Sequence, residues 1–103
     1  MGGEIMAKHL ILWSLNEARI PVDPKERGSG YELLTAMVKQ DIEKGIIKDY
    51  GTFPGEGKGY VVAEGTYLEI MKMTEQYVPY VQFEIHPAAS ISEVVELIKH
   101  LTG

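Results

Sequence analysis

The spacing of hydrophobic and polar positions divides the chain into short strands and amphipathic helices. Apolar or alternating stretches predict strands at residues 9–15, 46–53, 60–64 and 79–86. Apolar residues recur every three or four positions at residues 31–44, 67–77 and 91–101, which is typical of helices packed on one side. The resulting order is β-α-β-β-α-β followed by a terminal helix. It predicts an α+β domain, a ferredoxin-like sandwich with a C-terminal helix.

The first helix has two possible starting points. Asp23 followed by Pro24 is one, and a capping box at residues 29–32 is the other. Gly28 and Gly30 disfavour a rigid helix between the two, so the firm helix is expected from residue 31 onward. Gly45 is predicted to end it.

The later boundaries also carry local signals. Capping boxes at residues 66–69 and 90–93 predict the starts of the second and third helices. In the second helix Met71 is expected in the core and Met73 on another side. Pro87 is predicted to end the fourth strand. The terminal helix has a continuous apolar stripe, which must pack on its own domain or reach across to a partner.

Composition limits the range of functions. The 103 residues suit one domain, residues 1–103, in which residues 1–7 are expected to be a flexible lead-in. The absence of cysteine excludes disulfides, thiolate catalysis and thiolate-bound metals. A net charge of -5 without a basic cluster argues against nucleic acid and anionic membrane as partners. The start does not resemble a signal peptide and no apolar run is long enough to span a membrane, so a cytoplasmic location is expected.

The sheet surface opposite the helices is expected to be amphipathic. In the fourth strand, residues 81, 83 and 85 alternate with the more polar Tyr80, Gln82, Glu84 and His86. A surface that mixes tyrosines with a few charges suits a half-wet space between two sheets better than open water. We therefore predict a homodimer, in which two sheets form a dimeric α/β barrel.

Four ionisable residues are candidates for a catalytic site. In the split βαβ order, the start of the first strand lies beside the ends of the third and fourth strands. If His9 faces away from the helices, it meets Glu64, Glu84 and His86 there, and imidazoles with carboxylates can move protons near neutral pH. The alternative is that all four are solvated strand ends or dimer contacts. Their spacing does not favour a metal site, and no metal or cofactor is predicted.

A second group is predicted to bind a ligand. Aromatic rings with hydroxyl groups suit a planar organic molecule, and the tyrosines equally suit a dimer interface. Lys48 could contact an anionic group, and Trp13 belongs to the group if the alternation of the first strand allows. The full set is Tyr50, Tyr60, Tyr80, Gln82, Lys48 and Trp13.

Segments at residues 8–13, 45–51, 59–65 and 78–87 resemble the dimeric α/β barrel superfamily. Within it the chain is most similar to a group of domains of unknown function and to the muconolactone isomerase-like proteins. Lys8-His9 also resembles the stress-responsive A/B barrel proteins, but residues 84–89 lack their second-half His-Pro-x-His pattern. The resemblance implies the fold and the dimer. The superfamily hosts isomerases, monooxygenases, cyclases and ligand-sensing domains, so it does not select one activity.

The leading functional hypothesis is a small-molecule-binding dimeric α/β barrel protein. Its acid/base version isomerises or cyclises a small oxygenated organic compound. One alternative is a non-catalytic dimeric module that binds a ligand or regulates another process. A heme- or metal-dependent monooxygenase is the third hypothesis.

Overall fold

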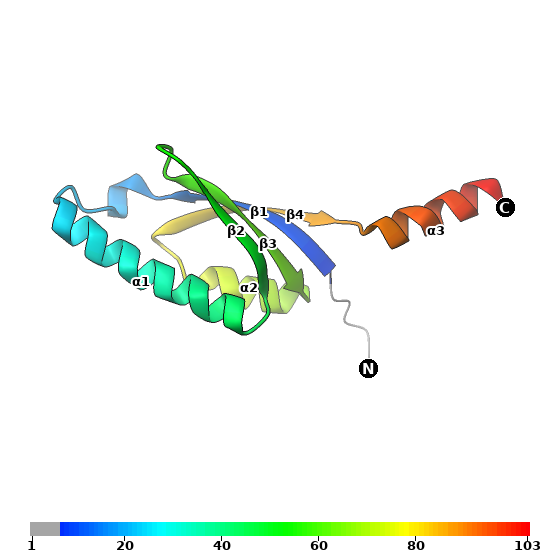
Figure 1. The fold of residues 1–103 in the computed structure, drawn as a ribbon, viewed down its shortest axis with the longest axis horizontal. Coiled ribbons are helices and arrows are strands. Elements are labelled where there is room, and N and C mark those ends of the chain that lie inside the picture. Colours follow the sequence, from blue (N-terminus) through cyan, green and yellow to red (C-terminus); the bar gives the residue numbers. More distant parts are fainter. Residues whose placement is uncertain (1–6) are drawn as a thin grey trace.

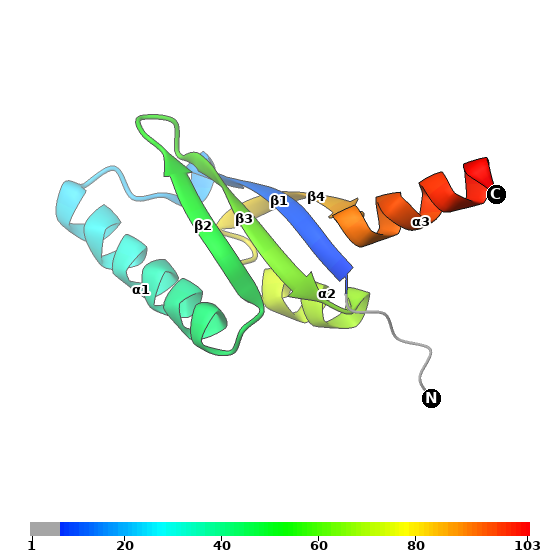
Figure 2. The ribbon, with the colours of Figure 1, turned by 45° about the vertical axis from the view of Figure 1, so that its right-hand side comes forward.

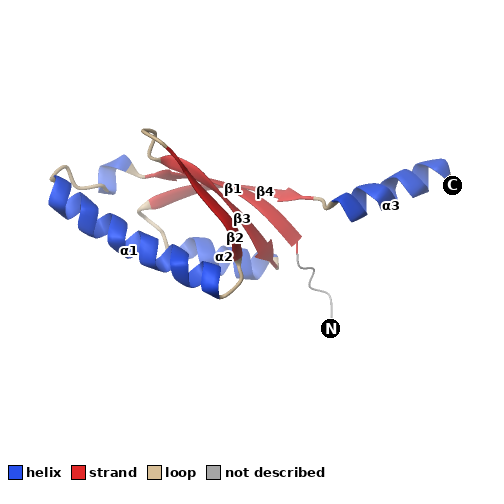
Figure 3. Ribbon diagram, in the orientation of Figure 1, coloured by secondary structure: helices blue, strands red, loops and turns tan. Residues whose placement is uncertain are grey.

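A computed structural model describes residues 7–103 as one antiparallel sheet with two helices on one face and a third helix beyond the end of the sheet (Figures 1 and 3). The elements are β1 (Ala7–Leu15), a short 3-10 turn (Glu17–Arg19), α1 (Pro24–Glu43), β2 (Ile47–Phe53), β3 (Lys58–Gly65), α2 (Tyr67–Glu75), β4 (Val81–Ala88) and α3 (Ile91–Thr102). The strand order is β2-β3-β1-β4. These features confirm the predicted β-α-β-β-α-β order with a C-terminal helix and are consistent with a ferredoxin-like fold. Residues 1–6, most of the predicted lead-in, lie outside the described part.

The core lies between the sheet and the two helices that cover it. Alternate residues of the strands point into it, because successive side chains of a strand face opposite sides. The buried hydrophobic residues are Ile11, Ile47, Val61, Ala63, Ile70, Met73, Tyr77 and Val81. The opposite sheet surface is not covered by any helix of residues 7–103, and we refer to it as the open face.

Helix α1 begins earlier than predicted. Asp23 caps it by accepting a hydrogen bond from the Glu26 amide at 3.1 Å, and Pro24 is its first residue. The helix then continues through Gly28 and Gly30, so the expected interruption was wrong. A glycine costs only about 1 kcal/mol in a helix, which a capped start and packing downstream can offset.

Two other local predictions were also wrong. Met73 is buried and Met71 is exposed, because the side of α2 that faces the sheet is defined by Ile70 and Met73. Strand β4 continues through Pro87 to Ala88. Proline fits there because β4 is an edge strand, where one side of the backbone needs no partner.

A bulge in β2 reverses the side to which its later residues point. Between Ile47 and Asp49 the pairing with β3 shifts by one residue, at Lys48. Tyr50 then pairs with Val61 and shares its core-facing side, whereas regular alternation predicted Tyr50 on the open face. The bulge thus moves one predicted ligand-binding tyrosine to the other side of the sheet.

Helix α3 extends away from the rest of the domain. In Figures 1 and 2 it continues beyond the end of β4 and points away from α1. The molecule is accordingly elongated, with extents of 61 × 31 × 21 Å. In the part of the chain that the structure describes, no helix combines the length and the hydrophobicity needed to cross a membrane.

Candidate functional site

A cavity of about 350 Å³ lies between the sheet and α1. This volume is within the range of small-molecule sites, roughly 300–1,000 Å³. Helix α1 contributes Tyr31, Leu34, Thr35 and Val38, and the β2–β3 turn borders the cavity at Gly55 and Gly57. The sheet and α2 side supply the rest of the wall, mostly aliphatic and aromatic residues. Among residues 7–103, none that lines this cavity carries a formal charge.

Two parallel aromatic rings form part of the cavity wall. Trp13 of β1 and Tyr50 of β2 have ring centroids 5.9 Å apart and planes inclined by 11°. They come together because Gly59, which pairs with Trp13 across β1 and β3, has no side chain between them. A Cβ atom on Gly59 would lie 2.4 Å from the indole and 2.1 Å from the Gly51 carbonyl oxygen. Gly59 is therefore required for the position of Trp13.

The cavity wall offers few hydrogen-bonding groups. The Tyr50 hydroxyl is paired with the Thr52 hydroxyl at 2.6 Å. The Trp13 indole N–H is buried and has no partner among the described residues. A buried donor without a partner is uncommon in folded proteins. The arrangement suits a ligand that is mainly apolar and carries few polar atoms.

A buried carboxyl group supports the inner end of the cavity. Asp41 of α1 is 1% exposed and accepts a hydrogen bond from the Tyr77 hydroxyl at 2.8 Å. The Gln76 amide lies 3.4 Å from both oxygens of the same carboxyl group. Burial, and then the hydrogen bond to Asp41, raise the pKa of Tyr77 above its ordinary value of 10.0. Tyr77 lines the cavity, so this pair fixes the distance between α1 and the end of α2.

The predicted catalytic residues do not meet at one site. His9 is fully buried on the helix-covered side, where its ring lies edge-on to Tyr67 at 5.6 Å and its Nδ1 donates to the Ala7 carbonyl at 3.0 Å. Its Nε2 has no hydrogen-bond partner among the described residues. His9 faces this side because it shares the alternation of Ile11, a core residue. The condition that placed His9 beside the other three residues is therefore not met.

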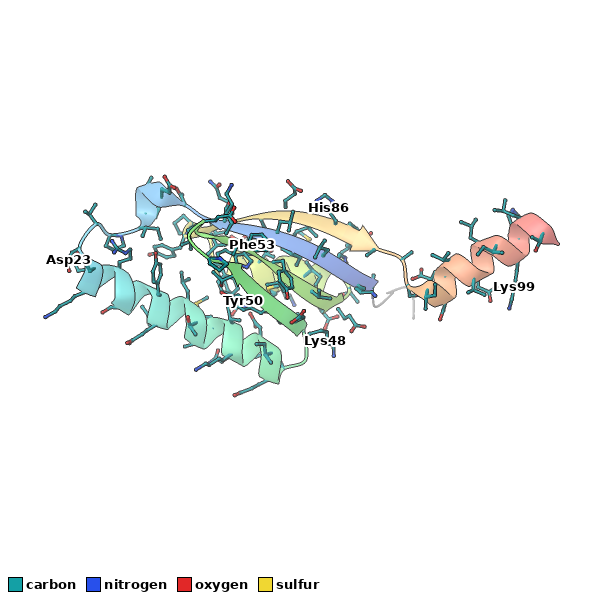
Figure 4. The ribbon with its side chains drawn as sticks, turned by 45° about the horizontal axis from the view of Figure 1, so that its top comes forward. Asp23, Lys48, Tyr50, Phe53, His86 and Lys99 are labelled. Carbon is teal, nitrogen blue, oxygen red and sulfur yellow. The ribbon has the colours of Figure 1, made fainter. Side chains whose placement is uncertain are left out.

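The other three residues lie on the open face. His86 Nε2 and Glu84 Oε2 are 2.5 Å apart and both side chains are largely exposed. Glu64 pairs with Lys8 at the end of β3, with β1 between it and His86. Two strand spacings and an offset of two residues along the strands make that separation roughly 12 Å. Figure 4 shows His86 on the sheet surface opposite α1. Only Glu84 and His86 are thus in contact.

The predicted ligand-binding residues are divided between the two sides. Trp13 and Tyr50 line the cavity, and Figure 4 shows Tyr50 on the side of the sheet that faces α1. Tyr60 lies on the open face, where its hydroxyl donates to Asp49 at 3.0 Å. This hydrogen bond and the charge of Asp49 raise the pKa of Tyr60. The remaining three are exposed: Gln82 on the open face, Lys48 at the bulge, and Tyr80 just before β4.

Sequence reasoning missed Asp41, Tyr77 and Tyr31. A signal for Asp41 exists, since it lies three positions after Val38 on the apolar side of α1. A buried carboxyl group on this side needs a hydrogen-bond donor, and Tyr77, two residues after the end of α2, supplies it. Helical spacing from Leu34 and Val38 favours Ile42 on the same side, yet Ile42 is 46% exposed.

Searches for metal sites and for related proteins gave no assignment. Within residues 7–103, no group of three or more His, Asp or Glu side chains is placed to hold a metal ion. Comparison of the sequence with models of protein families and with curated proteins found no match. The similarity to dimeric α/β barrels therefore remains an expectation from the sequence.

Proposed function

We propose that this protein binds a small, flat and mainly apolar organic molecule between α1 and the sheet. The observation that carries the proposal is the cavity of about 350 Å³, walled by the Trp13–Tyr50 pair and by uncharged side chains. Aromatic walls favour flat ligands, because ring faces and edges provide large contact areas. The lack of a charged group in the wall favours a binding module over acid/base chemistry inside this cavity.

Energy transfer from tryptophan provides a direct test. Trp13 is the one tryptophan of the chain, so its emission reports on the cavity wall alone. Dansylamide, a neutral aromatic probe that accepts energy from tryptophan, should bind with quenching of Trp13 and gain of dansyl emission. Leu34→Phe should weaken this binding about tenfold or more, because the added ring fills cavity volume.

The neighbouring position supplies the control. Leu33 is 70% exposed and does not line the cavity, so Leu33→Phe should leave the affinity for dansylamide unchanged. Equal binding by wild type and Leu34→Phe would show that the probe does not enter the cavity. Absence of energy transfer in the wild type would refute the proposal directly.

We further propose that the protein is a homodimer of the dimeric α/β barrel type. The support is the open face, where Leu10 and Leu12 are 40% and 36% exposed beside Tyr60 and Val62. Helices cover the other side, so a second sheet is the natural cover for this band. In such a dimer Glu84 and His86 lie next to the space between the sheets.

Acid/base catalysis by this pair is the second candidate function. The contact of 2.5 Å between Glu84 and His86 favours it, because a carboxylate orients an imidazole for proton transfer. A β,γ-unsaturated lactone is a suitable probe, since moving its double bond requires a proton to be removed and another added. His86→Ala should abolish isomerisation and His100→Ala should not. Turnover that survives in His86→Ala would exclude this role.

A further inference from the structure

Helix α3 carries an apolar stripe that nothing in the described chain covers. Its large hydrophobic residues are all at least 40% exposed, and they are Ile91, Val94, Val95, Leu97, Ile98 and Leu101. Figures 1 and 2 show the helix extending away from α1, α2 and the sheet. Isolated helices of about 12 residues are marginal in water, so a helix of this length needs packing to persist.

Helix α3 follows β4 closely and, in Figures 1 and 2, does not fold back over its own sheet. Strand β4 ends at Ala88 and α3 begins at Ile91, which leaves two residues between them. Ser90 is also engaged as the helix cap: its hydroxyl accepts from the Glu93 amide at 3.2 Å and its amide donates to the Glu93 carboxylate at 2.9 Å. Since no part of residues 7–103 covers the stripe in this arrangement, the surface considered for it is that of another molecule.

Charge and area favour a second copy of the same chain as that molecule. The side of α3 opposite the stripe carries Glu93, Glu96 and His100, and the chain has a net charge of -5, so an anionic membrane is a poor partner. The apolar surface of one α3 is on the order of 500 Å². Two copies of it approach the roughly 1,200–2,000 Å² of specific interfaces, and the open faces supply the remainder.

We infer that α3 is exchanged between the two protomers of a dimer, each helix packing by its apolar stripe on the partner. The inference rests on the homodimer proposed above. The open faces form the centre of the interface, and α3 extends it at both ends, because α3 follows directly from the edge strand β4. Twofold symmetry makes the contact occur twice. Loss of one stripe residue therefore weakens the dimer at two places.

Lysine substitution on the two sides of α3 tests the inference. Ile98→Lys places a charge in the stripe. His100→Lys places the same side chain two positions further along the helix, on its polar side. In sedimentation experiments at micromolar concentration, wild type and His100→Lys should be dimers of similar affinity. Ile98→Lys should raise the dimer dissociation constant by about 100-fold or more. Unchanged Trp13 emission in Ile98→Lys verifies that the sheet remains folded.

Amide hydrogen exchange distinguishes packing of α3 on the partner protomer from packing of α3 on its own protomer. Amides of α3 should lose protection as the wild type is diluted below its dimer dissociation constant, while those of β1 retain it. A wild-type dimer whose affinity is unaffected by Ile98→Lys would overturn the role of α3 and leave the proposed dimer intact. Hydrogen-exchange protection of α3 that does not depend on protein concentration would also overturn the role of α3. A monomeric wild type would overturn both.

Discussion

Gly59→Ala should destabilise the protein and disturb the cavity wall. The new methyl group would lie 2.1 Å from the Gly51 carbonyl oxygen and 2.4 Å from the Trp13 indole. Both distances are far below van der Waals contact, and neither the sheet backbone nor a packed indole can move freely. Forcing a methyl group into a packed region costs about 1–3 kcal/mol. Because two rigid neighbours are affected, we expect a value near the upper end, about 3 kcal/mol.

Urea unfolding at one fixed protein concentration measures this cost, because association would otherwise change the apparent stability. Trp13 emission should also shift in folded Gly59→Ala, since the indole must move away from Tyr50. Gly28→Ala is the matched control. Apart from its two chain neighbours and the backbone of its own helix turn, nothing lies within 4 Å of a Cβ atom built on Gly28, which is inside α1, so alanine there should stabilise by about 0.4–1 kcal/mol. A Gly59→Ala variant as stable as the wild type would refute the close approach of Trp13.

The remaining predictions concern the buried carboxyl group and the cap of α3. Asp41→Ala should lower the free energy of unfolding in urea by about 1–3 kcal/mol, because it leaves the Tyr77 hydroxyl unpaired. The double variant Asp41→Ala with Tyr77→Phe should lose less stability than the sum of the two single variants. Since the pKa of Tyr77 is raised above 10.0, its stabilising contribution is complete below about pH 10 and is lost as the pH rises further. Tyr77→Phe should therefore lose less stability than the wild type when the pH is raised above about 10. Hydrogen bonds with the Ser90 backbone and hydroxyl lower the pKa of Glu93 below 4.5, so the cap stabilises α3 above that pH and this contribution is lost as the pH falls. Glu93→Gln should therefore make the hydrogen-exchange protection of α3 amides less dependent on acid pH.

Features with local causes were predictable from the sequence. The capping boxes at residues 66–69 and 90–93 are both formed, because a cap needs only a side chain and an amide three residues apart. The order of strands and helices follows from periodicity, which is also local. The start of α1 shows the limit of such signals. Gly28 and Gly30 weaken helix propensity, yet Asp23 and the packing of the later turns hold one continuous helix.

The direction of individual side chains was harder to predict. One extra residue at Lys48 reverses every later side chain of β2, and no residue pattern marks that position. In β1 both sides are apolar near the middle, with Leu10 and Leu12 on one and Ile11 and Trp13 on the other. The pattern therefore could not decide whether His9 faces the helices. As a result the predicted tyrosine cluster and the four-residue catalytic group were each divided between the two faces.

The proposed ligand cavity and the proposed dimer interface lie on opposite faces of the sheet. Strand β1 contributes Trp13 to the cavity and Leu12 to the open face, and these residues are adjacent in the chain. Side chains on opposite faces of a sheet do not contact each other, so binding in the cavity and association through the open face can vary independently. Gly59 and Gly51 are the exceptions. Gly59 accommodates Trp13 on one face, Gly51 accommodates Tyr60 on the other, and a Cβ atom on Gly59 would also meet the Gly51 carbonyl oxygen. We expect any coupling between ligand binding and dimerisation to pass through these glycines, because at each of them an aromatic ring rests against the backbone, Trp13 on the cavity side and Tyr60 on the open face.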